Sequence, residues 1–166
     1  MAKPTKNATP ICITLSIILG IGILFGLIYF NPMIIILALF PAVIYEVYRT
    51  EGDSTRWASW AMLGVMIAEV IVVAFNLKFD LAQFLGLSGQ YVSGHWVPFG
   101  EVRAIFPALT GVLALILFFR TQGIYTRWLS VLIFIGALGI VFTVDKTLFK
   151  ELLRTVINEG MGRLNF

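Results

Sequence analysis

The sequence has little charge, one histidine and one cysteine. Only 13% of the 166 residues are charged, and the single histidine and cysteine are His95 and Cys12. One cysteine cannot form an internal disulfide, so it gives no information on the redox compartment. No long apolar run contains a histidine, which argues against a haem or metal centre held by this chain alone. We therefore predict no metal site and no cofactor, and we interpret His95 as a loop residue; a site shared with a neighbouring protein is the alternative.

Signatures of catalysis are also missing. The chain has no nucleophile elbow, phosphate-binding loop, HExxH, CxxC or paired-carboxylate motif. Enzymatic activity of the isolated chain is therefore not expected. A membrane enzyme that acts on a lipid or a quinone would need Arg49, Arg120 or His95 together with groups that the sequence does not identify, so we rank this function last.

Apolar residues make up most of the chain. Hydrophobic residues account for 59% of the sequence, and the mean hydropathy is +0.93. A soluble domain of this length has too much surface to bury such a fraction, so the bilayer must be the solvent for most of it. The net charge of +3 then reflects basic residues at helix ends, and we predict no nucleic-acid partner. We expect bound membrane lipids.

Five apolar segments predict an all-α integral membrane protein that forms a single polytopic domain over residues 1–166. The predicted transmembrane helices cover about residues 11–30, 32–48, 57–77, 104–119 and 128–144. Asn31-Pro32 separates the first two, because proline lacks an N–H donor and disfavours helical geometry in the residue before it. Residues 78–103 are predicted to form a non-cytoplasmic loop. The tail, 145–166, is amphipathic and predicts an interfacial helix over about 146–158.

A short motif occurs twice, between the second and third segments and between the fourth and fifth. Residues 48–59 and 119–130 are identical at seven of twelve positions. The repeated residues include Arg49, Thr50, Gly52, Arg56, Trp57, Arg120, Thr121, Gly123, Arg127 and Trp128. We interpret the motif as a helical corner that is built twice, with positive φ at its glycine and an N-cap at Thr55 and Thr126. An internal hairpin repeat of 32–77 and 104–144 would explain it, and so would two independent solutions to the same corner.

The basic residues predict an orientation. Both motif loops, 49–56 and 120–127, carry two arginines, and Lys3 and Lys6 precede the first segment. The opposite side has as many basic residues, but most of them follow the last helix and should weigh less. The positive-inside rule then places the N-terminus and both loops in the cytoplasm and the C-terminus outside, in a membrane that we expect to be a prokaryotic cytoplasmic membrane.

Glu69 stands in the middle of the third segment. An ionised carboxylate at such a depth costs on the order of 2.5–3.5 kcal/mol on insertion scales, and such residues usually face the bundle interior. Ile140 stands at the matching position after the second motif. We favour a role of Glu69 in helix packing or inter-subunit pairing over a role in proton or ion transport. Glu46 and Asp145 lie near segment ends and are predicted to be interfacial.

Small residues predict close helix contacts. Gly22 and Gly26 form a GxxxG pattern, and Gly136 and Gly139 occur in the fifth segment. Abundant packing surfaces beside missing catalytic residues lead to our first hypothesis, a non-catalytic integral subunit that scaffolds or stabilises a larger multi-subunit membrane complex. Its partners would be other integral membrane subunits, or further copies of the chain. The alternative is a small oligomeric transporter or channel that uses the intramembrane carboxylate of Glu69.

Overall fold

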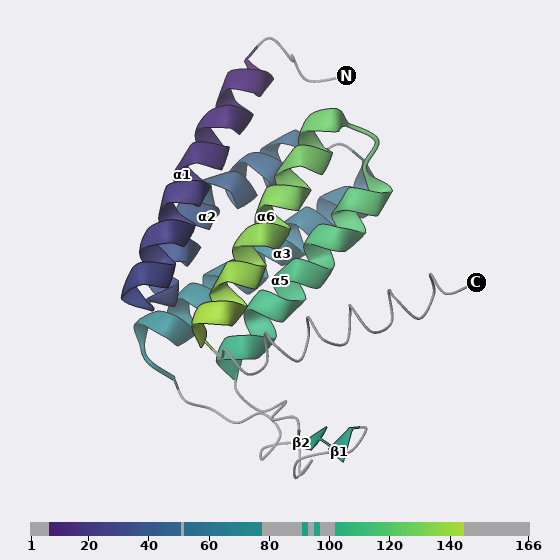
Figure 1. Ribbon diagram of the computed structural model, residues 1–166. Helices are drawn as coiled ribbons and strands as arrows, with labels where there is room; N and C mark the ends of the chain where they lie inside the picture. Colours follow the sequence, from purple (N-terminus) through teal and green to yellow (C-terminus); the bar gives the residue numbers. More distant parts are fainter. Residues whose placement is uncertain (1–6, 51, 78–90, 93–94, 97–101, 145–166) are drawn as a thin grey trace, which may run out of the picture.

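The computed structural model describes residues 7–50, 52–77, 91–92, 95–96 and 102–144. It contains five long helices, which are α1 (Ala8–Tyr29), α2 (Pro32–Arg49), α3 (Asp53–Ala74), α5 (Val102–Arg120) and α6 (Ile124–Val144) (Figure 1). All five are long and apolar enough to cross a membrane, so the predicted all-α membrane fold with five spans is confirmed. Two short strands, β1 (Tyr91–Val92) and β2 (His95–Trp96), pair in antiparallel fashion within the predicted loop. The predicted tail helix over 146–158 lies outside the described residues.

The break between the first two helices follows the predicted chemistry. Phe30 ends α1 in the left-handed conformation, with φ of 49°. The side chain of Asn31 accepts a hydrogen bond from the main-chain nitrogen of Met33 at 3.0 Å, and Pro32 occupies the first turn of α2. Proline suits this position because the first helical N–H groups have no partner within the helix. Asn31-Pro32 therefore ends one helix and begins the next.

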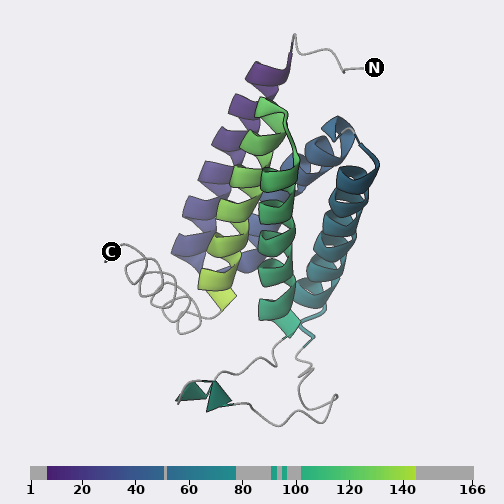
Figure 2. The ribbon, with the colours of Figure 1, turned by 90° about the vertical axis from the view of Figure 1, so that its right-hand side faces the viewer.

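Four of the helices form a ring. Each of α2, α3, α5 and α6 packs against two others, in the order α2–α3–α5–α6 and back to α2, and α1 packs outside the ring on α2 and α6. Figures 1 and 2 show that the start of α1 and the two corners, α2 to α3 and α5 to α6, lie at the same end of the bundle. We refer to this as the corner end, and to the opposite end, where α5 begins, as the loop end.

The two hairpins, α2–α3 and α5–α6, turn corresponding residues inward. Residues at the same distance from the two corners are buried in both hairpins. The buried pairs are Ile36 and Pro107, Leu39 and Thr110, Val43 and Ala114, Glu46 and Leu117, Thr50 and Thr121, Thr55 and Thr126, Ser59 and Ser130, Met62 and Ile133, Met66 and Ala137, and Glu69 and Ile140. They stack as layers along the ring. A parallel repeat of hairpins would produce such matching layers.

Glycines allow the helices around α1 to approach closely. A Cβ atom on Gly22 would collide with the Ala38 side chain of α2, and one on Gly26 would collide with Ile35. A Cβ atom on Gly136 of α6 would come within 2.8 Å of Leu39. These three glycines therefore serve contacts inside the chain.

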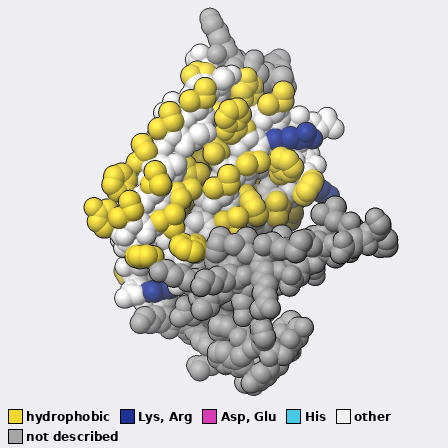
Figure 3. All heavy atoms as spheres, in the orientation of Figure 1, with side chains coloured by type: hydrophobic (Ala, Val, Ile, Leu, Met, Phe, Trp, Pro, Cys, Tyr) yellow, Lys and Arg dark blue, Asp and Glu magenta, His cyan; other side chains and the backbone are white. Residues whose placement is uncertain are grey.

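The outer surface suits lipid. Figure 3 shows hydrophobic side chains over most of the described part of one face of the molecule, with few basic side chains among them. The large exposed hydrophobic residues on α1 include Ile17, Ile21, Leu24 and Ile28. Such a face would be costly in water, whereas the acyl chains of a bilayer cover it without a protein partner.

Candidate functional site in the helical bundle

Glu69 is buried inside the ring of helices. Its side chain is 1% exposed, and neither carboxyl oxygen has a hydrogen-bond partner among the described residues. The residues of its layer are Ile36 of α2, Pro107 of α5 and Ile140 of α6, all buried. An ionised carboxylate without a partner is strongly disfavoured in apolar surroundings, so the neutral, protonated acid is the form that this layer accommodates. Glu69 is therefore placed to hold a proton.

Thr110 presents a second unpaired oxygen. The residue is fully buried on α5, and its hydroxyl has no hydrogen-bond partner in the described part of the chain. Other buried threonines bond to a main-chain carbonyl instead, as Thr121 does to Leu117 at 2.8 Å. Thr110 lies one helical turn closer to the corner end than Pro107, which belongs to the layer of Glu69. An acid and a hydroxyl thus occur about one turn apart along the ring interior.

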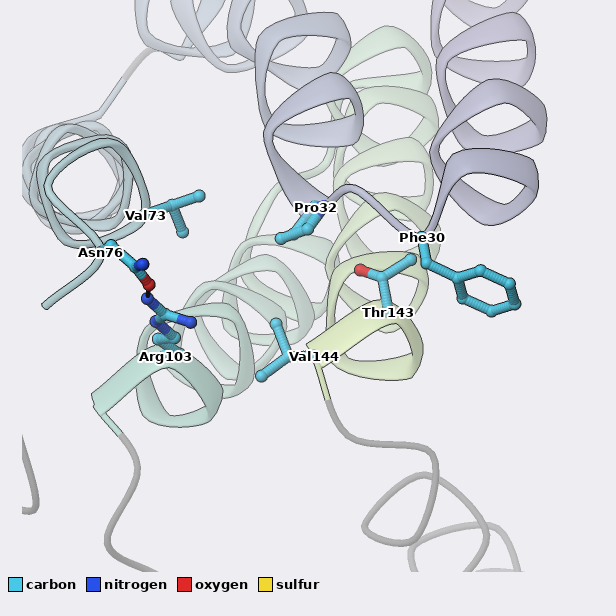
Figure 4. Close-up of a pocket in the computed structure, with 7 residues that line it drawn as sticks. All are labelled: Phe30, Pro32, Val73, Asn76, Arg103, Thr143 and Val144. Atoms are coloured by element: carbon cyan, nitrogen blue, oxygen red, sulfur yellow. Dashed lines mark hydrogen bonds between the residues drawn. The ribbon is translucent and has the colours of Figure 1, made fainter. Parts of the chain in front are cut away.

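A pocket of about 260 Å³ opens at the loop end. It is lined by Phe30, Pro32, Val73, Asn76, Arg103, Thr143 and Val144 (Figure 4). Val73 stands one turn after Glu69 on α3, and Val144 stands one turn after Ile140 on α6. The pocket therefore begins about one helical turn beyond the layer of Glu69, toward the loop end.

Arg103 brings positive charge to this pocket. Its guanidinium donates a hydrogen bond to the side-chain oxygen of Asn76, and Figure 4 shows the two side chains facing each other across the ends of α3 and α5. The Nε atom of Arg103 is buried and has no hydrogen-bond partner among the described residues. The pocket therefore has polar groups where α3 and α5 line it, in contrast to the apolar residues in the layer of Glu69.

Glu46 forms a polar cluster with two hydroxyls near the corner end. The residue is fully buried in the bundle. The Thr50 hydroxyl donates to the main-chain oxygen of Glu46 at 2.7 Å and lies 3.4 Å from its carboxyl Oε1. The Ser59 hydroxyl donates to Thr50 Oγ1 at 2.8 Å. Glu46 lies near the end of α2, which packs against α3 and α6.

The two corners use the same hydrogen bonds. In each, hydroxyl groups of the motif lie at hydrogen-bond distance from the same main-chain oxygens. The bonds are Thr50 to Glu46 (2.7 Å) and Thr121 to Leu117 (2.8 Å), Thr55 to Gly52 (3.0 Å) and Thr126 to Gly123 (2.8 Å), and Ser59 to Thr55 (3.1 Å) and Ser130 to Thr126 (2.9 Å). The repeated hydroxyl residues thus hold each corner together, which accounts for their recurrence without a ligand.

Two details of the corner differ from the sequence prediction. The helices begin earlier than predicted, at Asp53 and Ile124, so Thr55 and Thr126 lie inside the first turn and are not N-caps. Gly52 has φ of +110°, as predicted, but it is the only described glycine with positive φ. Gly123 meets a different requirement, because a Cβ atom there would come within 2.8 Å of the Thr126 hydroxyl.

The arginines and tryptophans of the motif have different surroundings. The guanidinium of Arg49 lies 5.1 Å from the ring centroid of Tyr125, a cation–π distance, whereas Arg127 donates from Nε to the main-chain oxygen of Thr121 at 2.9 Å. Trp57 is 79% exposed, while the Trp128 indole donates to Ser16 of α1 at 3.1 Å. Arg56 and Arg120 are exposed. The motif therefore does not present one common set of side chains to a ligand.

The sequence pointed to Glu69 but missed Glu46, Thr110 and the Arg103 pocket. A signal existed for the first two. Extending the alignment of the two motifs beyond their identical residues pairs Glu46 with Leu117 and Thr110 with Leu39, so each hairpin has a polar residue where the other is apolar. The pocket had no signal, because it depends on how five helix ends meet.

Buried acids are the chemistry that the described residues offer. Those residues contain no group of three His, Cys, Asp or Glu side chains that could hold a metal ion. Cys12 is buried in α1, and the backbone of His95 lies in β2. Glu69 and Glu46, each enclosed near one end of the ring, can bind and release protons. Comparison of the chain with protein-family models, with curated proteins and with solved structures finds no match.

Proposed function

We propose that this protein is a small membrane transporter or channel in which Glu69 is the intramembrane site. The observation that carries the proposal is a buried carboxyl group, one helical turn behind a pocket, whose two oxygens have no hydrogen-bond partner among the described residues. Buried polar groups in proteins are nearly always hydrogen-bonded, and those without a partner call for an explanation. Acidic residues inside membrane bundles commonly mark proton or ion paths.

A purely structural role for Glu69 is less well supported. A carboxyl group that fixed helix packing would do so through hydrogen bonds, and Glu69 makes none to the described residues. The layer also does not need an acid, because Ile140 fills the matching place in the second hairpin and is equally buried. The carboxyl group therefore lowers the free energy of unfolding and makes no compensating contact with the described residues, as is common for residues that serve a function.

We expect Glu69 to be reached from the loop end, because the pocket there begins about one helical turn beyond it. In the orientation that the basic residues favour, this end faces away from the cytoplasm. Labelling of a Gln122→Cys variant in a Cys12→Ser background tests the orientation, since Gln122 is exposed at a corner. A membrane-impermeant maleimide should label this cysteine in inside-out vesicles and not in right-side-out vesicles. The reverse pattern would place the pocket on the cytoplasmic side.

Ion flux in reconstituted vesicles tests the function. Wild-type protein should dissipate an imposed proton or cation gradient, and Glu69→Gln, which has the same shape but cannot ionise, should not. Glu69→Asp keeps the acid and serves as the matched control, with partial flux expected. A wild-type protein without any flux, or a Glu69→Gln variant with full flux, would contradict the proposal.

The role as a scaffold subunit is the second candidate, and the exposed apolar stripe on α1 that contains Ile17, Ile21, Leu24 and Ile28 is the surface that a membrane partner would occupy in place of lipid. Gly22 and Gly26 no longer support this role, because they contact α2 inside the chain and not a partner helix. Extraction in mild detergent distinguishes the candidates. A stoichiometric membrane partner that co-migrates with the chain would favour the scaffold, and a chain that migrates alone would exclude it.

A further inference from the structure

Unpaired oxygens of three buried side chains occur at different depths of the ring. They belong to Glu69 near the loop end, Thr110 one turn further in, and Glu46 near the corner end, and each residue is at most 1% exposed. Each oxygen lacks a hydrogen-bond partner among the described residues, so each could bond to an internal water molecule or to a moving proton. The three residues come from three different helices of the ring, α3, α5 and α2.

The two acids are separated mainly along the bundle. Ser59 is linked to Glu46 through the Thr50 hydroxyl, so it marks the depth of Glu46 on the neighbouring helix α3. From Ser59 to Glu69 the helix rises about 15 Å at 1.5 Å per residue. This distance is too long for a direct transfer between carboxyl groups, and it requires intermediate hydroxyl groups or water. Thr110 lies within this interval, toward Glu69.

The interval is otherwise filled with apolar side chains. They are Leu39, Val43, Met62, Met66, Ala114 and Ile133, all fully buried. A hydrated metal cation would need a polar cavity through these layers, because it must keep water or protein oxygens around it. A proton needs only a transient file of oxygens. The methionines favour such brief openings, since Met is unbranched and has several rotatable bonds.

Glu46 has a connection to the corner end that Glu69 lacks. Its carboxyl oxygen lies near the Thr50 hydroxyl, which receives the hydrogen bond of Ser59. Arg49 is three residues further along α2, a spacing that puts two side chains on neighbouring positions of a helix surface. The Arg49 guanidinium can therefore stabilise the Glu46 carboxylate that remains after Glu46 releases a proton toward the corner end.

We infer that the transported species is the proton and that Glu46 is the second proton-binding group, connected to Glu69 through Thr110. An O–H bond at Glu69 breaks as one forms on the Thr110 hydroxyl, whose own proton passes to transient water molecules in the remaining interval, and the transfer ends with an O–H bond at the Glu46 carboxylate. The carboxylate left at Glu69 is reprotonated from the loop-end pocket, and Glu46 releases its proton through the hydroxyls near the corner. One proton crosses, and no other bond changes. This inference rests on the proposed function.

Proton flux into vesicles that contain a pH-sensitive dye tests the inference. Glu46→Gln should reduce the flux about tenfold or more, as Glu69→Gln does, which corresponds to at least about 1.4 kcal/mol on the barrier. Thr110→Val, which removes only the hydroxyl, should reduce it less, by about threefold. Thr14→Val is the matched control, because Thr14 is exposed on α1 and bonds to its own helix, and flux should not change.

Several outcomes separate this inference from the proposed function. Normal flux in Glu46→Gln with lost flux in Glu69→Gln would overturn the relay and leave the function of Glu69 standing. No flux in the wild type would overturn both. Flux that disappears when choline replaces sodium would show that the species is a metal cation. If Glu46→Gln does not fold, Glu46→Leu, which copies Leu117 of the other hairpin, and Glu46→Asp test the same point, and full flux in Glu46→Leu would overturn the relay.

Discussion

The hairpins α2–α3 and α5–α6 share a frame but differ in chemistry. Their corners have the same hydroxyl–carbonyl bonds, and their inward residues are buried at matching positions. The first hairpin has Glu46 and Glu69 where the second has Leu117 and Ile140, and all four residues are at most 1% exposed. The second hairpin shows that this frame forms with apolar residues in both places. The acids of the first hairpin are therefore additions to the frame, which is why we assign them to function.

Exchanging the chemistry at one layer should give the largest effect. Ile140→Glu places a second acid in the layer of Glu69, and we expect it to lower the free energy of unfolding by about 2.5–3.5 kcal/mol. Glu69→Ile should leave stability unchanged or raise it, because an apolar side chain replaces a buried acid that has no hydrogen-bond partner among the described residues. Reversible unfolding in mixed micelles measures both variants.

The contrast between the two hairpins would be wrong if Glu69→Ile lowered the free energy of unfolding as much as Ile140→Glu. Such a result would mean that the Glu69 carboxyl has a stabilising partner, and a structural role would then replace the functional one. Glu69→Gln is the matched control, since it keeps the size and removes only the ionisable group.

The two hairpins also differ in their contacts with α1, which packs on α2 and α6. Gly136 of α6 lies at this contact, and its substitution tests how tightly the helices pack there. Gly136→Ala would place a Cβ atom within 2.8 Å of Leu39, at a point where Leu19 of α1 is also close. We expect a loss of about 1–3 kcal/mol from overpacking. In the control, Gly139→Ala, the nearest side-chain atom is 3.6 Å away and stability should hardly change. Equal losses in the two variants would show that the contact at Gly136 relaxes freely.

The glycines of the two corners should respond differently to alanine. Gly52→Ala forces a side chain into a backbone with φ of +110°, at a cost of about 1–2 kcal/mol. Gly123→Ala should cost less, because its contact is with the end of the Thr126 side chain, which can rotate. Thermal unfolding of the two variants in the same detergent measures the difference. The opposite order would mean that the hydroxyl bond of Thr126 matters more than the backbone conformation of Gly52.

Local sequence signals predicted the spans well. The Asn31-Pro32 break separates α1 and α2, and the apolar runs match the five helices. The starts of α3 and α6 were missed, because the threonine and arginine residues soon after Gly52 and Gly123 resemble a loop although they already belong to the first helical turns. Hydropathy identifies the segments that lie in the membrane. It does not identify these first turns, which are stabilised by hydrogen bonds from threonine hydroxyls to the glycine carbonyls.

The candidate site was only half visible in the sequence. Glu69 stands out because a charge in an apolar run is conspicuous at any burial. Glu46 does not, since its burial depends on contacts of α2 with helices far along the chain. A buried threonine such as Thr110 is common, and it is distinctive here because its hydroxyl has no hydrogen-bond partner in the described part of the chain. A local sequence pattern can therefore identify an acid in an apolar segment. The residues around that acid, and the pockets near it, depend on tertiary contacts that the pattern does not contain.

The smallest expected difference concerns the tryptophans of the two corners. Trp128 donates to Ser16 of α1 at 3.1 Å, whereas Trp57 is 79% exposed and has no α1 beside it, because α1 packs on α2 and α6. Trp128→Phe should lower the free energy of unfolding by about 0.6 kcal/mol, the average for a hydrogen bond between membrane helices. Trp57→Phe should have no measurable effect on unfolding. Ser16→Ala provides the control, since after it Trp128→Phe should cost nothing further; a remaining loss would mean that the indole ring, and not its N–H group, holds α1 to the second hairpin.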